Sequence, residues 1–318
     1  MAYILLIIGF VLLIKGADYF VQGASNIAVK LNVSPLLVGL TIVALGTSSP
    51  EATVAILAAL DGSAGVVLGN VIGSNIVNMT VVVGLTAVIA PLTVQSETVR
   101  KEIPFALLGA VVMMVLMMDT FLQDSPSNAI TRGDGIIILL FFLIFLYYVF
   151  EMARKNRSGT VAEAPTDYGE PWWKNILFTL GGLAAIIIGG EMVVSSATEI
   201  ALALGMSEAL VGLTIVAVGT SLPEIMTSVT AALKGKGDMA IGNVVGSNIF
   251  NIFFVTGTAA TVSSIAAESK LFLDGFVMVG LTVLLLIFSR THFSIGRREG
   301  AFMLVAYTAY LTYIIIRN

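Results

Sequence analysis

The chain has 318 residues, of which 57% are hydrophobic and 11% are charged, with a formal net charge of -4 and no cysteine. A soluble domain carries about 25% charged residues, so this composition excludes a water-soluble protein and predicts one that lies in a lipid bilayer. The absence of cysteine excludes disulfides, zinc–thiolate sites and thiol nucleophiles, and the negative charge argues against a nucleic-acid partner.

Long apolar stretches follow one another along the whole chain. A helix needs about 20 apolar residues to cross the hydrocarbon core of a bilayer, and ten stretches come to about that length. We therefore expect an all-α membrane protein with ten transmembrane helices and no separate soluble domain. The expected helices cover residues 3–30, 36–60, 65–90, 98–119, 130–153, 174–203, 209–233, 239–262, 269–289 and 297–316.

Lysine and arginine residues are divided unevenly between the loops that join these helices. One alternating set of loops holds 12 of the 16 cations, and the opposite set, together with both termini, holds three. Cytoplasmic loops carry such an excess in membrane proteins. The distribution predicts a multi-pass protein of the cell (inner or plasma) membrane, with both termini extracellular or periplasmic and the loop 154–173 cytoplasmic.

Two segments of the first half recur in the second half at a constant offset of 173 residues. GLTIVALGTSSPEA at 39–52 recurs as GLTIVAVGTSLPEI at 212–225. GNVIGSNIVN at 69–78 recurs as GNVVGSNIFN at 242–251. An internal repeat of this kind indicates that the chain consists of two related halves.

The same register extends upstream, where Asp18 corresponds to Glu191. We expect a first half at 1–153, a cytoplasmic linker at 154–173 and a second half at 174–318. Five helices in each half is an odd number, so the second half must enter the membrane with reversed polarity. Inverted repeats are characteristic of secondary transporters, which bind their substrates at the repeat interface near mid-membrane.

Each copy of the first motif places a glutamate, Glu51 or Glu224, inside an apolar helix. A carboxylate in this environment costs several kcal/mol unless it is compensated. Pro50 and Pro223 precede the two acids, and a proline removes the hydrogen bond to the residue four positions earlier. We therefore expect helices 2 and 7 to be broken or kinked, with hydroxyl groups on the carboxylate's helical face and free carbonyl groups facing an interior cavity.

The second motif adds a serine and an asparagine one helical turn apart, Ser74 with Asn78 and Ser247 with Asn251. Together the motifs supply carboxylate, hydroxyl, amide and carbonyl oxygens, with no imidazole or thiolate. Such ligands suit hard cations, and Ca²⁺ takes about six to eight oxygens. The same oxygens could hold Na⁺, and competition for shared carboxylates would couple the movements of the two ions.

At these residues the sequence resembles the Ca²⁺:cation antiporter superfamily, and within it the sodium/calcium exchangers of prokaryotes, whose paired repeats carry GTSxPE and GSN segments. The resemblance implies two inverted five-helix halves and alternating-access antiport, with Ca²⁺ and Na⁺ as transported substrates. We accordingly expect no enzymatic activity, no organic cofactor and a monomer in the bilayer. The ligand set that the resemblance implies comprises Ala44, Thr47, Ser48, Glu51, Ser74, Asn78, Ala217, Thr220, Ser221, Glu224, Ser247 and Asn251.

One member of this set departs from the family pattern, because some relatives carry aspartate where Asn251 stands. Two central carboxylates rather than three put the occupancy of this position and any K⁺ requirement in question, and a K⁺-dependent exchanger is kept as an alternative. Proton-coupled members commonly carry histidine after the glutamate, where this chain has Ala52 and Ile225, so Na⁺ coupling is favoured over H⁺/Ca²⁺ exchange. Outside the antiporters, the alternatives are a cation channel and an intramembrane aspartyl protease, which would need a closely placed aspartate pair.

Overall fold

The computed structural model describes residues 2–159, 170–206 and 217–317, and nearly all of them are helical. In the first half the elements are α1 Ala2–Leu31, α2 Pro35–Val38, π-helix η1 Gly39–Val43, α3 Ala44–Thr47, α4 Ser49–Leu60, α5 Ala64–Val77, π-helix η2 Asn78–Val82, α6 Val83–Ile89, β1 Leu92–Thr93, π-helix η3 Thr98–Glu102, α7 Ile103–Leu116, α8 Asp119–Leu122, β2 Ala129–Ile130 and α9 Arg132–Gly159.

The second half repeats much of this order. Its elements are α10 Trp172–Ala203, α12 Ala217–Gly219, α13 Leu222–Leu233, α14 Gly237–Ile249, π-helix η5 Phe250–Val255, α15 Thr256–Val262, β3 Ile265–Ala266, α16 Ser269–Arg290, β4 Ser294–Ile295 and α17 Arg297–Arg317. The bounds of α4, α6 and β1 recur at an offset of 173 in α13, α15 and β3. The repeat seen in the sequence is therefore also a repeat of secondary structure.

Seven helices of the described residues are long and apolar enough to cross a membrane, and an eighth candidate is the bent pair Pro35–Thr47 and Ser49–Leu60. The expected span 98–119 is helical only from Thr98 to Leu116, as η3 followed directly by α7. The expected span 209–233 begins outside the described residues, which include only its last part, from Ala217. An all-helical, multi-pass membrane protein is confirmed, and the count of ten helices stays a prediction.

The predicted break in helix 2 is confirmed, because the chain bends by 49° between α3 and α4. Pro50 lies in the first turn of α4 and has no N–H for the Gly46 carbonyl. In the second half Pro223 lies in the first turn of α13, and helix α12 ends at Gly219, just before it. Both carboxylate-bearing helices thus begin at the expected proline.

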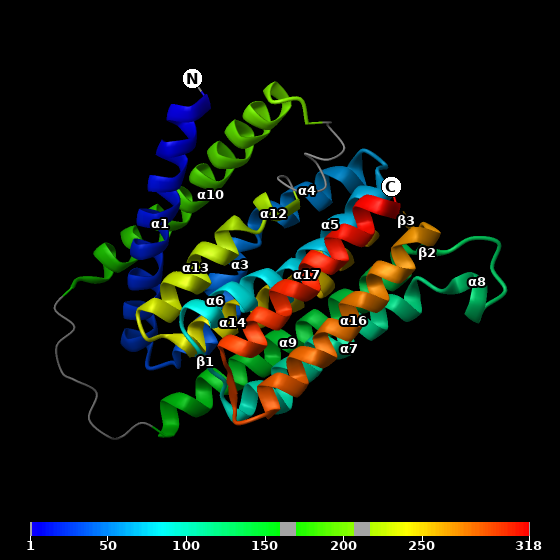
Figure 1. The fold of residues 1–318 in the computed structure, drawn as a ribbon. Coiled ribbons are helices and arrows are strands. Elements are labelled where there is room, and N and C mark those ends of the chain that lie inside the picture. Colours follow the sequence, from blue (N-terminus) through cyan, green and yellow to red (C-terminus); the bar gives the residue numbers. More distant parts are fainter. Residues whose placement is uncertain (1, 160–169, 207–216, 318) are drawn as a thin grey trace.

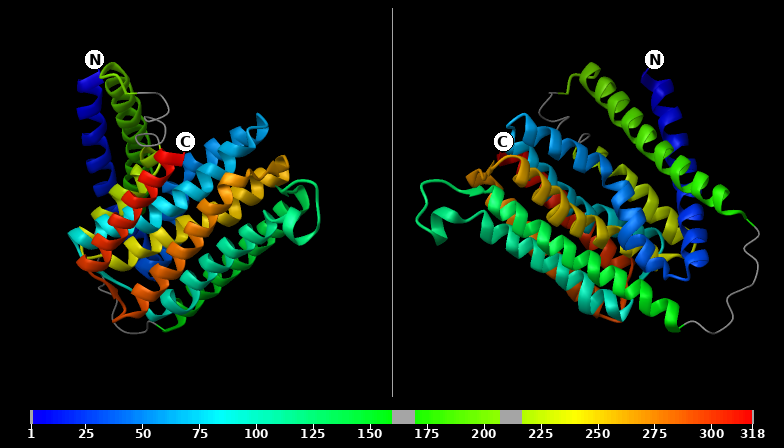
Figure 2. Two further views of the ribbon diagram at one scale, coloured as in Figure 1. Left: turned by 45° about the vertical axis from the view of Figure 1, so that its right-hand side comes forward. Right: turned by 180° about the vertical axis from the view of Figure 1, so that it is seen from behind.

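Helices α1 and α10 lie side by side along one flank of the molecule, and the other helices form a bundle beside them (Figures 1 and 2). A Cβ added at Gly16 would lie 2.9 Å from the Gly182 carbonyl oxygen, and one at Gly189 would lie 2.8 Å from the Gly9 carbonyl oxygen. The residue number of the contacted glycine on α10 decreases as the residue number on α1 increases, so the two helices run antiparallel. Gly9 and Gly16 correspond in the repeat to Gly182 and Gly189, so these contacts are reciprocal.

Two short antiparallel strand pairs tie the loops together, β1 with β4 and β2 with β3. The pairs lie at opposite ends of α16, which begins three residues after β3 and ends four residues before β4. Under the repeat β1 corresponds to β3 at the offset of 173, and β2 and β4 each end two residues before the last helix of their half, α9 or α17, so the two pairs are reciprocal in element order.

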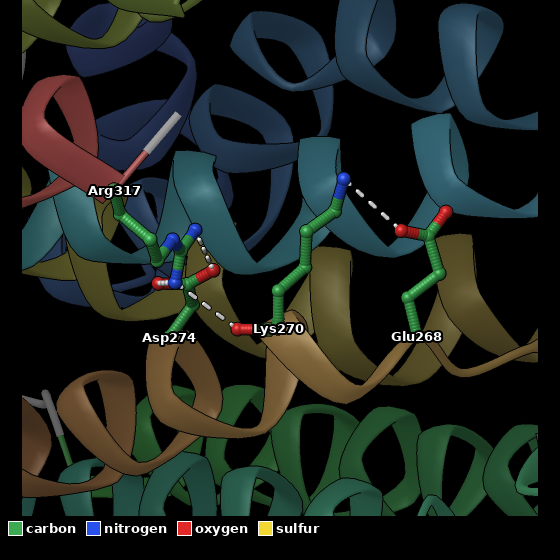
Figure 3. Close-up of polar contacts among 4 residues, drawn as sticks. All are labelled: Glu268, Lys270, Asp274 and Arg317. Carbon is green, nitrogen blue, oxygen red and sulfur yellow. Dashed lines mark hydrogen bonds and ion pairs between the residues drawn. The ribbon is translucent and has the colours of Figure 1, made fainter.

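The end of α17 is held on α16 by a forked ion pair (Figure 3). The Arg317 Nη1 and Nη2 atoms each donate to one carboxylate oxygen of Asp274 at 3.0 Å, and Nη1 also donates to the Lys270 carbonyl at 3.1 Å. A second pair, Lys270 with Glu268 at 3.1 Å, lies next to it and is more exposed. The buried aspartate of α16 is therefore charge-compensated.

Candidate functional site

The two carboxylates singled out by the sequence are buried in the centre of the bundle. Glu51 is 1% exposed and Glu224 is 0% exposed. Each lies in the first turn of its helix, α4 or α13, where the N-terminal end of the helix dipole favours negative charge. The two carboxylates lie in one region, because Ser48, three residues before Glu51, contacts Glu224. The breaks in the helices thus bring two acids, one from each half, to one place.

A hydroxyl group of the first half also hydrogen-bonds to the carboxylate of the second half. The Ser48 Oγ atom donates to Oε1 of Glu224 at 2.9 Å, and both residues are buried. Ser48 is the residue at which the 49° bend occurs, between α3 and α4. The bend therefore places Ser48 next to the carboxylate of Glu224, in the other half.

A second contact between the halves joins the expected ligand Thr47 to Asn243, which was not in the expected ligand set, and to Ser228, which the sequence reasoning missed. The Thr47 Oγ1 atom donates to Oδ1 of Asn243 at 3.1 Å, and Nδ2 of Asn243 donates to Ser228 Oγ at 3.0 Å. Asn243 belongs to the GNVVGSN motif, so the motif itself pointed to it. Ser228 lies one turn after Glu224 on α13, and this spacing was the signal that could have found it.

The serines and asparagines of the second motif line the same region. Ser74 lies on α5 and Asn78 begins π-helix η2, while Ser247 lies on α14 and Asn251 lies in π-helix η5. All four residues are buried. The carboxylate helices reach across, because α13 packs against η2 and α4 packs against η5. Each glutamate helix thus lies next to the asparagine turn of the other half.

The π-helices were not expected from the sequence. A π-helical turn inside a helix is rare and is found mostly at functional sites. Here one follows the GSN segment in each half, and the Thr256 hydroxyl donates to the carbonyl of Asn251 five residues earlier, at 3.2 Å. The extra residue in the π-helical turn changes the rotation of the helix after the asparagine. The asparagine side chain therefore points in a different direction from the one it would have in a regular α-helix.

The remaining expected ligands lie on the broken helices. Ala44 begins α3 and is buried, and Thr220 lies between α12 and α13 and is partly buried. Ala217 begins α12, and its side chain lies outside the described residues. Helix α12 packs against α5, so the backbone of this segment lies near the Ser74 helix.

Many buried polar atoms of the site have no hydrogen-bond partner among the described residues. They include Glu51 Oε1 and Oε2, Glu224 Oε2, Ser221 Oγ, Ser247 Oγ, Asn78 Oδ1 and Nδ2, and Asn251 Oδ1 and Nδ2. Buried polar groups are normally paired, and leaving one unpaired costs about 1–3 kcal/mol. A set of such oxygens around two carboxylates fits a site that is completed by a bound cation.

The chemistry of these donors matches hard cations rather than transition metals. Among the described residues there is no group of three or more His, Cys, Asp or Glu side chains that could hold a metal ion. The site instead surrounds two carboxylates with neutral oxygens, which suits Ca²⁺ and Na⁺.

Comparison with known proteins gives a consistent result. The model of the sodium/calcium exchanger protein family matches residues 1–151 and 174–316. CaxA of Alkalimonas amylolytica is 38% identical and the sodium/calcium exchanger MaX1 of Methanosarcina acetivorans is 34% identical, each over 97% of both chains. A solved structure of the sodium-calcium exchanger NCX_Mj superimposes with a TM-score of 0.83 at 32% identity, covering 98% of both chains.

Proposed function

We propose, because this chain belongs to the sodium/calcium exchanger family, that it exchanges Na⁺ for Ca²⁺ across the membrane by alternating access. The family makes it a multi-pass membrane antiporter of cations. The observation that carries the ion assignment is the pair of buried carboxylates, one from each half, surrounded by unpaired oxygens. Two carboxylates balance the charge of one Ca²⁺, and Na⁺ can use the same oxygens.

The proposed ligands are those that the resemblance implied. Glu51 and Glu224 are shared by the two ions, and the neighbouring hydroxyl, amide and backbone oxygens complete each coordination shell. Support comes from the burial of the described ligand side chains and from the contacts of α4 with η5 and of α13 with η2. The remaining proposed ligands are Ala44, Thr47, Ser48, Ser74, Asn78, Ala217, Thr220, Ser221, Ser247 and Asn251.

The proposed architecture is ten helices in two inverted halves, 1–153 and 174–318, in a monomer. Three observations support it: the antiparallel packing of α1 on its repeat counterpart α10, the reciprocal strand pairs, and the two segments matched by the family model. The β1–β4 pair joins two loops that the cation count assigns to the cytoplasm, and the β2–β3 pair joins two assigned to the outside.

Flux in proteoliposomes tests the proposed exchange. Vesicles that contain the purified protein are loaded with Na⁺ and diluted into medium with ⁴⁵Ca²⁺ and choline. Uptake that requires internal Na⁺ and stops when a Na⁺ ionophore collapses the gradient supports the proposal. Uptake that is unaffected by collapse of the Na⁺ gradient contradicts it.

The same vesicles separate the two alternative exchangers. Ca²⁺ uptake driven by a pH gradient without Na⁺ would identify H⁺/Ca²⁺ exchange, which the residues Ala52 and Ile225 disfavour. Uptake that requires K⁺ together with Na⁺ would identify a K⁺-dependent exchanger, which the neutral Asn251 leaves open.

A further inference from the structure

We infer that Asn243 is a positioning residue that draws the hydroxyl proton of Thr47 away from the Glu224 carboxylate and so leaves that carboxylate free for the ion. The inference rests on the proposed ion site and adds to it a residue outside the ligand set. The Thr47 hydroxyl group has one proton and several acceptors close to it, so it can donate to only one of them at a time.

Three acceptors surround the Thr47 hydroxyl. The Asn243 Oδ1 atom lies 3.1 Å from Thr47 Oγ1 and the Ala44 carbonyl oxygen lies 3.4 Å from it. The carboxylate of Glu224 lies in the same region, because Ser48, the residue after Thr47, donates to its Oε1 atom at 2.9 Å. Ser48 already donates to Glu224, so a second donor from Thr47 would occupy more of the charge that a cation needs. A proton given to Asn243 instead leaves the Thr47 oxygen as an acceptor, available to the ion.

The Asn243 amide is held between Ser228 and Thr47. The Nδ2 atom of Asn243 donates to Ser228 Oγ at 3.0 Å, so the carbonyl oxygen of the amide must point the other way, toward Thr47. All three side chains are fully buried, so no water competes for these bonds. By accepting from Nδ2, Ser228 stabilises the amide orientation in which Thr47 meets an acceptor.

The repeat shows that this arrangement is not a general consequence of the GN motif. Asn70 occupies the same motif position in the first half, but Ala55 stands where Ser228 stands in the second. Without that hydroxyl, Asn70 Nδ2 donates to the backbone carbonyl of Glu51 at 3.1 Å. Two asparagines at equivalent positions therefore have different partners, and among the described residues the relay to a threonine of the opposite half exists on one side only.

Equilibrium binding of ⁴⁵Ca²⁺ to the purified full chain, with Na⁺-driven ⁴⁵Ca²⁺ uptake in proteoliposomes, tests the inference. One hydrogen bond contributes about 0.5–1.5 kcal/mol, so we expect Asn243→Ala to weaken Ca²⁺ affinity about three- to tenfold. Ser228→Ala should also weaken it, by about threefold. Both variants should raise the KM for Ca²⁺ more than they lower kcat, whereas loss of packing alone would reduce the amount of active protein.

A double-mutant cycle identifies the route of the effect. In a Thr47→Val background Asn243→Ala should change affinity, or kcat/KM where binding is weak, by less than about twofold, because it acts through the Thr47 hydroxyl. Asn70→Ala is the matched control and should keep its full effect in that background. Asn175→Ala removes another fully buried asparagine, at the α1–α10 contact, and should leave Ca²⁺ affinity unchanged.

The possible outcomes distinguish a failure of this inference from a failure of the proposed function on which it rests. Native protein that neither binds Ca²⁺ nor transports it with Na⁺ would overturn the proposed function itself. Native protein that binds Ca²⁺ while both Asn243→Ala and Ser228→Ala bind within twofold of it would overturn the role of Asn243 alone. If Asn243→Ala does not fold, the milder Ser228→Ala decides by the same twofold criterion.

Discussion

At the scale of single residues, the site is an arrangement of oxygens whose charge comes from two side chains only. Glu51 and Glu224 are buried, yet they differ in their partners: Glu224 accepts from Ser48, whereas neither oxygen of Glu51 has a described hydrogen-bond donor. Glu51 and Glu224 occupy equivalent positions in the repeat, and the same Thr-Ser pair precedes each of them. The difference therefore comes from the relative position of the two halves.

We expect Glu51→Gln and Glu224→Gln each to reduce Ca²⁺ transport by about 100-fold or more. Each change removes one of two charges that balance the divalent ion, and a charge pair near a protein surface is worth about 4 kcal/mol at 4 Å. Initial rates of ⁴⁵Ca²⁺ uptake measure the loss. Glu97→Gln, in a half-exposed pair with Lys101, is the control and should transport normally. Normal transport by either site variant would refute the assignment.

At the scale of elements, broken helices and π-helices present the polar groups. Each glutamate lies in the turn that follows a proline, and each GSN segment runs into a π-helix. An unbroken α-helix would pair its own backbone groups and offer none to an ion. Irregular backbone thus occurs at the positions where the bundle carries Glu51, Glu224 and the two asparagines, although π-helices η1 and η3 also lie elsewhere.

We expect Pro50→Ala to impair transport while changing the free energy of unfolding by less than about 1 kcal/mol. Alanine supplies an N–H that can pair the Gly46 carbonyl and favours a straighter helix across the 49° bend. Uptake assays and thermal unfolding in detergent measure the two effects. Pro104→Ala is matched, because Pro104 also lies in the first turn of a helix, α7, which carries neither Glu51 nor Glu224. Equal impairment in both variants would argue against a specific role for the bend.

A single ion pair joins α1 to the turn after α13 and has no counterpart in the repeat. The Lys234 Nζ atom lies 2.5 Å from Oδ1 of Asp18. The corresponding residues, Asp61 and Glu191, are both acidic, so they cannot form the same pair. This ion pair therefore links α1 to the turn after α13, whereas the equivalent position on α10 cannot form such a pair.

Reversal of this charge pair tests its contribution. Both side chains are partly exposed, so we expect Lys234→Asp to lower the free energy of unfolding by no more than about 1 kcal/mol. The swapped double variant Asp18→Lys with Lys234→Asp should restore it. Thermal unfolding at low and at high salt measures both, and Asp61→Asn is the control. A double variant no better than Lys234→Asp would show that the pair does not act through charge.

At the scale of the whole molecule, the fold is held together by close helix contacts and a few polar ties at its ends. The glycines of α1 and α10 let the two backbones approach, and the two strand pairs connect loops distant in sequence. The Arg317–Asp274 fork fixes α17 on α16 (Figure 3). These contacts fix the ends of the outer helices, while the proposed ion site lies between the halves.

We expect Arg317→Gln to destabilise the protein by about 1–3 kcal/mol, because it leaves the buried carboxylate of Asp274 without its cation. The double variant Arg317→Gln with Asp274→Asn should recover much of this loss. Lys270→Gln is the control in the same region, since its pair with Glu268 is exposed and should cost under about 1 kcal/mol. Thermal unfolding in detergent ranks the three variants, and equal stability of all of them would contradict the prediction.

The sequence by itself determined the membrane environment, the helical class, the duplicated halves, the proline breaks and the two carboxylates. These are properties of hydrophobic length, residue order and residue type, which can be read along one dimension. The tertiary structure decided which half each side chain meets: Ser48 with Glu224, Asn243 with Thr47, Lys234 with Asp18. It also decided the π-helices, because the backbone register after Asn78 and Asn251 depends on packing against the opposite half. Identical motifs acquire different partners because the two halves do not occupy identical surroundings.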